Sequence, residues 1–412
     1  MAFALCAALT CCAHARAQDT RPAEESTQEE IRALHDRIDA LERTLQTREG
    51  AAAPSEGAFG QGNLFNPSLT FFFDMGGSLS SNGNDPRYNR FNLREIEMDA
   101  RAPIAPFADG VFILAFVEEF DDDEGEFENE VEVEEAYIDF HTLPWDTSIT
   151  GGKFRNAFGR NNVLHTHDLP QVDRPLAVQA FLGEEGLVTI GASADWLVPN
   201  PWDSYIELTA QVVNADGGEE SPILGGGAGA EDPAFLGHVK VFEDVGQNAS
   251  VEVGGSYLWG RTTDDADFDA NVFGIDGTYQ WRNPQAPDRK SFLFQTELFF
   301  SDSDVEDAGG AFRNSAFGTY AFAQWQLDRN WYAGVRVDYT DFPAIEERAV
   351  TDRDWAVSPY VSFYLTEFLR LRFEYQHLEQ RTDGSWDSEE IFFFQITYLF
   401  GAHPPHPYWV NR

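Results

Sequence analysis

Two stretches near the C-terminal end alternate apolar and polar side chains with a period of two residues. In residues 331–339 and again in residues 369–375, every second side chain is apolar or aromatic. Because successive side chains of a strand point to opposite faces, each stretch predicts a strand with one apolar and one charged face. Apolar faces bounded by aromatic rings are typical of strands that have lipid on one side and water on the other. The charged residues of the polar faces are Arg336, Asp338, Arg370, Arg372 and Glu374.

The same unit recurs along most of the chain and predicts about sixteen strands. Bacterial outer-membrane barrels have an even number of strands of about this length. No run of about 18 apolar residues follows the N-terminus, so no membrane-spanning helix is expected. We therefore expect an all-β fold, a transmembrane antiparallel β-barrel, because an open sheet edge cannot be satisfied in lipid. The predicted strands are 67–80, 89–102, 110–120, 131–142, 146–155, 186–198, 203–214, 235–243, 248–261, 270–282, 290–302, 314–327, 330–341, 353–365, 368–380 and 389–400.

The connections between these strands alternate in character. Tight turns such as 143–146 and 366–367 alternate with long acidic connections such as 215–232, 301–310 and 381–389. Short turns belong on the periplasmic side of such a barrel and long loops on the outside. Both ends of the barrel segment are then expected in the periplasm.

The remaining segments predict a simple domain organisation. Residues 1–17 are interpreted as a signal peptide that ends at the cleavage pattern Ala15-Arg16-Ala17, and all three cysteines lie within the first 12 residues. Residues 18–49 repeat apolar positions at spacings of three and four, which predicts a short periplasmic coiled-coil helix or, alternatively, one amphipathic helix packed on its own domain. Residues 50–66 are a linker, residues 67–400 the outer-membrane barrel, and residues 401–412 a periplasmic C-terminal tail.

Composition narrows the function classes. The chain has 70 Asp+Glu against 28 Lys+Arg, a formal net charge of −42, and 35 Phe. Such a charge repels nucleic acid, so no nucleic-acid partner is expected, and it favours a surface that gathers cations; solvated acidic loops are the plainer explanation. The catalytic motifs of hydrolases, nucleotide-binding enzymes and zinc proteases do not occur in the sequence, so we do not expect an enzyme.

Gly152–Gly159, with the sequence GKFRNAFG, resembles the GKF…FG signature of the phosphate-selective porin O and P family, and the segments 91–101 and 134–140 are similar to early hairpins of that family. The resemblance implies a homotrimer of sixteen-stranded barrels in outer-membrane lipid of the bacterial cell, each a passive water-filled channel for small hydrophilic solutes or ions. Phosphate selectivity in the family relies on many lumen arginines and lysines. Because acidic residues outnumber basic residues at the expected lumen positions, we do not expect selectivity for phosphate.

The connection 156–185 is too long for a simple rim loop, and it occupies the position of the third outer loop, which folds inward in sixteen-stranded porins. Our hypothesis is that its acidic groups face a basic wall of Arg336, Arg370 and Arg372, because charge at a constriction decides which ions enter. The alternative is that Asp168 and Asp173 pair locally with Arg160 and Arg174. The candidate constriction residues are Asp168, Asp173, Arg174, Arg160, Lys153, Arg155, Arg336, Arg370, Arg372, Glu374 and Asp338.

No cofactor is expected, apart from candidate sites for a divalent cation. His165 and His167 lie two residues apart, so on a strand both imidazoles would face one side, and they are the candidate metal ligands. Ordinary loop packing is the competing interpretation. His403 and His406 are a second histidine pair, and the acidic run 118–123 is a candidate site for Ca²⁺ at the outer mouth.

Two other readings of the chain stay open. A non-conducting barrel could act as an envelope anchor or cation-binding surface protein, with the coiled coil reaching peptidoglycan. A soluble secreted β-sandwich is the third reading. Single-channel conductance separates the non-conducting barrel from a porin. Release of the protein without detergent would indicate the soluble β-sandwich.

Overall fold

The computed structural model describes residues 66–411, except 84–85, 122–125, 203, 217–220, 227–231, 264–267, 308–309, 345–348, 383 and 403–406. The predicted signal peptide, the coiled-coil segment and nearly all of the linker lie outside the described residues. So do His403, His406 and most of the acidic run proposed for Ca²⁺. No helix in the described part of the chain is long and apolar enough to cross a membrane.

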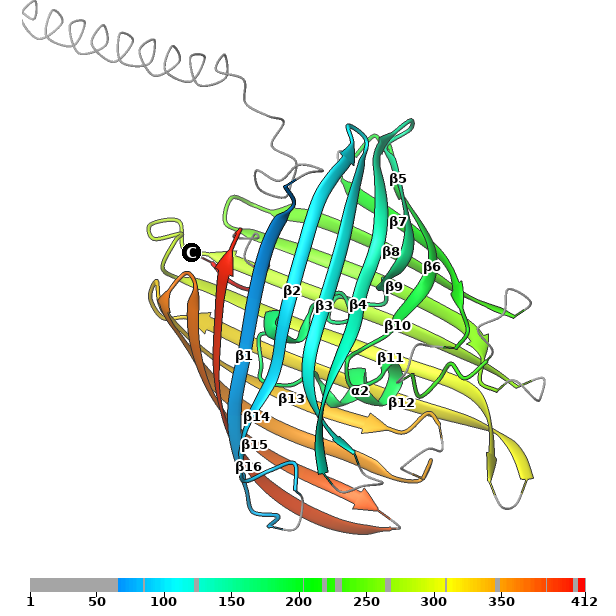
Figure 1. Ribbon diagram of the computed structural model, residues 1–412, viewed down its shortest axis with the longest axis vertical. Coiled ribbons are helices and arrows are strands. Elements are labelled where there is room, and N and C mark those ends of the chain that lie inside the picture. The colour runs from blue at the N-terminus through cyan, green and yellow to red at the C-terminus, as the bar shows by residue number, and fades with distance from the viewer. Residues whose placement is uncertain are drawn as a thin grey trace, which may run out of the picture. The chain divides into compact units, whose positions relative to one another are not determined.

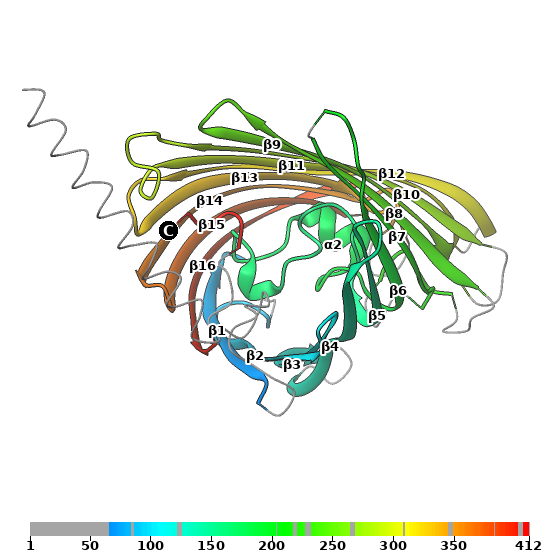
Figure 2. The same ribbon diagram turned by 90° about the horizontal axis from the view of Figure 1, so that it is seen from above.

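Sixteen antiparallel strands, each hydrogen-bonded to its neighbour in the chain, form a closed barrel (Figures 1 and 2). The barrel closes where β1 pairs with β16, with Phe71 opposite Phe400. The predicted fold class and the number of strands are confirmed. The strands are β1 Ser68–Ser80, β2 Phe91–Ala105, β3 Ala108–Asp121, β4 Glu126–Leu143, β5 Thr147–Arg155, β6 Val188–Leu197, β7 Tyr205–Asn214, β8 Pro233–Val245, β9 Ala249–Arg261, β10 Asp269–Arg282, β11 Ser291–Asp307, β12 Gly310–Gln326, β13 Trp331–Asp341, β14 Arg353–Thr366, β15 Leu369–Thr382 and β16 Ser385–Gly401.

The outer face of the barrel is apolar and rich in aromatic rings. Leu208 of β7, Val253 of β9 and Phe294 of β11 are all exposed on this face. Outward rings also stack between neighbouring strands, as Phe73 does on Tyr398 with centroids 4.7 Å apart. Apolar side chains exposed over a whole closed sheet require lipid around them, because monomeric soluble proteins rarely expose such large apolar patches.

Two of the predicted acidic loops are strand instead. β11 and β12 stay paired up to Asp307 opposite Gly310, and β15 and β16 up to Thr382 opposite Ser385. Arg313 on β12 explains the first case, because its guanidinium contacts Asp269, Asp302 and Asp304 on the neighbouring strands. These ion pairs neutralise the acidic run and let it continue the ladder beyond the predicted end at residue 302.

Residues 156–187, here called the interior loop, connect β5 to β6 and lie inside the barrel (Figure 2). They contain the short 3₁₀ helix η1 (Thr166–Asp168) and the helix α2 (Leu176–Leu182). Phe158 and Phe181 of the loop pack on Phe299 of β11, within an apolar cluster that faces the interior. The alternation predicted a polar inner face, so this cluster is a departure. It forms because inward aromatic residues of β11 and β12 are covered by the loop.

Candidate functional site

The interior loop leaves β5 through a position that requires glycine. Gly159 has φ +62°, and a Cβ atom there would lie 2.2 Å from Oε2 of Glu297 on β11. The Glu297 carboxylate accepts backbone N–H bonds from Arg160 at 3.0 Å and from Asn161 at 2.7 Å. Since left-handed backbone favours glycine, this residue lets the chain turn closely past a buried carboxylate and enter the lumen.

Arg336, Arg370 and Arg372, which we call the basic wall, project inward from β13 and β15 onto the loop. Arg372 donates hydrogen bonds to the carbonyl oxygens of Leu169, at 2.7 Å, and Gln171. Arg370 donates to the carbonyl of His167 at 2.7 Å. The basic wall therefore fixes the loop mainly through backbone carbonyls, rather than through the acidic side chains that the hypothesis placed there.

Asp173 is the loop carboxylate that does meet the basic wall. Its Oδ1 accepts from the Arg336 guanidinium at 2.8 Å, and its carbonyl accepts from the same group at 2.8 Å. The Arg336 side chain is fully buried, whereas 25% of the Asp173 side chain stays accessible. The Asp168 side chain is 35% accessible and lies 3.7 Å from Nε2 of His167.

Two acidic candidates on the strands hold the loop instead of facing open lumen. Glu374 accepts the backbone N–H of Val172 at 2.8 Å, and Asp338 accepts that of Leu176 at 3.2 Å. Asp338 also pairs with Arg336 at 2.7 Å. Both carboxylates therefore anchor the segment that leads into α2.

Two of the remaining basic candidates, Arg174 and Arg160, lie in different settings. Arg174 donates to the carbonyl of Leu164 at 2.7 Å, inside the loop itself. Arg160 pairs with Glu252 of β9 and lies over the ring of Tyr408 at 3.9 Å. These contacts differ from the local pairing with Asp168 and Asp173 that was the alternative to a wall-facing loop.

The side chains of Arg155 and Lys153, at the end of β5, point in different directions. Arg155 is buried and pairs with Glu134 at 3.4 Å. Lys153 stands opposite Ile190, which is 54% exposed on the outer face. Directly paired residues of antiparallel strands share a face, so the prediction that Lys153 lines the constriction is wrong. The alternation of β5 after Gly152 turns the Lys153 side chain outward.

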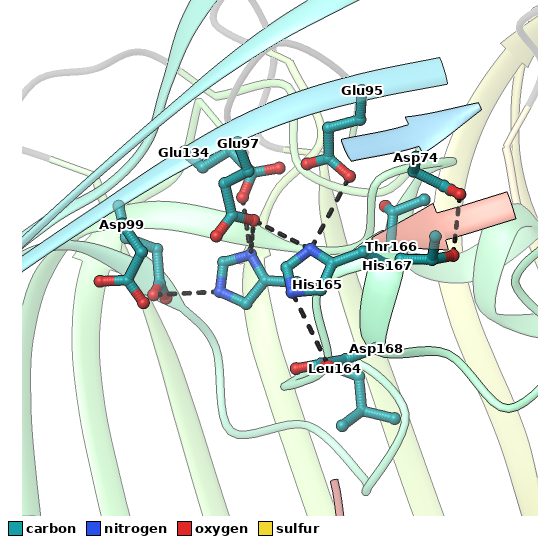
Figure 3. A network of polar contacts seen from close by, with 12 residues as sticks. Asp74, Glu95, Glu97, Asp99, Glu134, Leu164, His165, Thr166, His167 and Asp168 are labelled. Carbon is teal, nitrogen blue, oxygen red and sulfur yellow. Dashed lines mark hydrogen bonds and ion pairs between the residues drawn. The ribbon is translucent and has the colours of Figure 1, made fainter. Parts of the chain in front are cut away.

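An acidic wall, made of Glu95 and Glu97 on β2 and Glu134 and Glu135 on β4, meets the other side of the loop (Figure 3). Nδ1 of His165 lies 2.6 Å from Glu134 and 3.2 Å from Glu97, and its Nε2 lies 3.4 Å from Glu135. Nδ1 of His167 lies 3.2 Å from the same Glu97 oxygen, Oε2. The two histidines singled out from the sequence thus converge on one carboxylate.

Electrostatics favour a positive charge on the histidines of the loop. Burial alone would lower the pKa of His165, but the carboxylates of Glu97 and Glu134 raise it well above its ordinary value. Burial lowers the pKa of His167 and the Glu97 carboxylate raises it, and the net result is a raised pKa. The ring of His167 stacks on Phe72 with centroids 3.9 Å apart, which fixes its orientation.

Residues 407–411, near the C-terminal end, also contact inward-facing side chains. The indole Nε1 of Trp409 donates to the carbonyl of Asp168 at 2.7 Å, and Gln324 on β12 donates to the carbonyl of Trp409 at 3.0 Å. Gln326 donates to the carbonyl of Asn411 at 2.6 Å. Sequence reasoning missed this contact; the signal was the apolar run Tyr408 to Val410 in the segment that was expected to be a periplasmic tail.

Comparison with known proteins supports the fold. No family model matches the chain. An uncharacterized protein of Aquifex aeolicus is 27% identical over 345 residues, which cover 77% of this chain and 70% of that protein. Two solved structures each align over 81% of this chain. The outer membrane channel DcaP of Acinetobacter baumannii has a TM-score of 0.55 at 11% identity over 97% of its length. An anion-selective porin from Comamonas acidovorans has a TM-score of 0.51 at 10% identity over 99% of its length.

The fold and its apolar outer face define the class of protein: a sixteen-stranded, porin-like β-barrel of the bacterial outer membrane. The narrower resemblance to the phosphate-selective porin O and P family stays a prediction.

Proposed function

We propose that the protein is a passive channel for small hydrophilic solutes or ions, with a preference for cations and without selectivity for phosphate. One observation carries the proposal: the interior loop covers the basic charges and leaves acidic ones accessible. Arg336 is fully buried, while Asp173 and Asp168 stay 25% and 35% accessible. A solute that enters the barrel then meets loop carboxylates rather than wall guanidinium groups.

The wider charge balance of the interior has the same sign. Buried carboxylates outnumber buried arginines among the described residues. Fixed charges along a narrow path set which ions enter, and a net negative path attracts cations. Passive diffusion along such a path needs neither an energy source nor a catalytic step.

Reconstitution into planar bilayers tests this proposal. We expect stepwise conductance, and in a salt gradient a reversal potential of the sign that cation preference gives. Replacing chloride by phosphate should not raise the current, and a small panel of divalent cations should pass. A reversal potential of the opposite sign would overturn the cation preference.

A non-conducting barrel is the second candidate, and the packed interior favours it. The apolar cluster around Phe181 and Phe299 and the contacts of residues 407–411 occupy part of the lumen. Folded protein that inserts into the bilayer but shows no conductance steps would support this candidate over the channel. The homotrimer and the contact with peptidoglycan stay predictions under either function.

A further inference from the structure

The contact between the interior loop and the acidic wall has the composition of a transition-metal site. Glu95, Glu97 and His167 bring two carboxylates and one imidazole together, and Glu97, Glu134 and His165 form an adjoining group (Figure 3). Imidazole nitrogen combined with carboxylate oxygen suits divalent first-row transition metals, whereas Ca²⁺ and Mg²⁺ prefer oxygen ligands alone.

The spacing of the ligand atoms fits one shared ion. The ligand atoms of Glu95, Glu97 and His167 all lie within 4.8 Å of one another. Nδ1 of His167 lies 3.2 Å from Oε2 of Glu97 and 3.9 Å from Oε2 of Glu95. With metal–ligand bonds of about 2.0–2.2 Å, adjacent ligands of one tetrahedral or octahedral ion stand about 2.9–3.4 Å apart, so Glu95 needs only a small movement to join the other two ligands.

A second, independent observation points to a missing cation. Glu95 is 4% exposed and directed at His167, and neither of its carboxylate oxygens has a hydrogen-bond partner among the described residues. Oε2 of Glu97 and Nδ1 of His167 also lack a hydrogen bond of good geometry there. Buried polar and charged groups normally have hydrogen bonds or ions to compensate them, and these atoms belong to the one group of ligands formed by Glu95, Glu97 and His167.

We propose that Glu95, Glu97 and His167 bind one divalent first-row transition-metal ion inside the barrel. The ion joins the loop to β2 and so fixes the loop on its acidic side. The site is independent of whether the barrel conducts.

The test uses the full-length protein in detergent, stripped with a chelator and then titrated with Co²⁺ and Zn²⁺. We expect one Co²⁺ per chain, with the visible absorption of a cobalt ion bound by nitrogen and oxygen, and its displacement by Zn²⁺. Glu97→Gln and His167→Gln should each weaken binding at least about ten-fold. His377→Gln is the matched control, because His377 also contacts two carboxylates, Glu379 and Glu390, but at the surface.

Folding of each variant is checked by its heat-dependent mobility in gel electrophoresis. If Glu97→Gln does not fold, Glu95→Gln provides the same test. The proposal is wrong if the stripped protein takes up no stoichiometric Co²⁺. It is equally wrong if the control lowers uptake as much as the variants of the site do.

Discussion

The two walls of the barrel hold the same loop in opposite ways. On the basic wall, Arg370 and Arg372 meet backbone carbonyls, and Arg336 meets both the carbonyl and the carboxylate of Asp173. On the acidic wall, Glu97 meets imidazole side chains, and the carboxylate of Glu95 has no hydrogen bond among the described residues. The comparison indicates that the basic wall is a clamp whose guanidinium groups, apart from Nε of Arg370, bond to the protein itself, whereas the acidic wall retains capacity for a cation.

Removing the clamp should have the largest effect. In Arg336→Ala combined with Arg372→Ala, the loop keeps only the bond from Arg370 among its bonds to the basic wall. Asp173 and Asp338 lose their guanidinium partner. Breaking a buried ion pair costs about 3–5 kcal/mol, so we expect a large loss of thermal stability and a higher, noisier single-channel conductance.

The control for the clamp is Arg313→Ala on β12. Arg313 contacts three carboxylates but lies 36% exposed near the barrel rim. Its removal should change stability little, because exposed ion pairs contribute only about 0–1 kcal/mol each. Equal conductance of the clamp variant and the wild type, in folded protein, would show that the basic wall does not hold the loop.

A smaller loss of stability is expected from a substitution at Gly159, where the loop enters the lumen. Gly159→Ala forces a side chain into left-handed backbone and into the Glu297 carboxylate. Gly246→Ala is matched to it, with φ +73° and no atom within 4 Å of the added Cβ. The strain alone costs about 1–2 kcal/mol, so the midpoint of denaturation should fall in both variants and fall further in Gly159→Ala. Equal midpoints would contradict close packing of the loop on Glu297.

Substitutions of the two loop carboxylates, Asp173 and Asp168, should differ in their effect on thermal stability. Asp173→Asn weakens the bond to Arg336 and removes an accessible charge, whereas Asp168→Asn removes an accessible charge that lies 3.7 Å from Nε2 of His167. We expect both to lower cation preference in bilayer recordings, and only Asp173→Asn to lower thermal stability, by about 1–3 kcal/mol. Unchanged reversal potentials in both variants would exclude the loop as the selectivity filter.

The smallest effect concerns the contact of residues 407–411 with the loop. Trp409→Phe keeps an aromatic ring but removes the indole N–H that donates to the carbonyl of Asp168. One neutral hydrogen bond contributes about 1 kcal/mol, so a small drop in melting temperature is expected, with conductance nearly unchanged. A drop as large as that of the clamp variant would mean that the tail, rather than the basic wall, fixes the loop.

The sequence predicted the barrel well because each strand carries its own two-residue alternation. The inward direction of the loop followed from its length. The expectation for His165 and His167 assumed a strand, whereas they lie at the 3₁₀ helix η1, and each reaches the Glu97 carboxylate from there. Two features depended on contacts distant in sequence. The register of β3 against β4 shifts between Ile113 and Leu114, which turns Glu134 and Glu135 both inward. The contacts of Trp409 could be predicted only from the position of the interior loop inside the barrel, because the loop is its partner.

The most direct measurement of the central claim is the reversal potential of the wild-type channel and of the Asp168→Asn, Asp173→Asn double variant, in the same potassium chloride gradient. The account predicts cation selectivity in the wild type and a clear loss of it in the double variant, because the accessible carboxylates dominate the path while the basic wall stays covered. An anion-selective wild type, or a double variant with an unchanged potential, would contradict it.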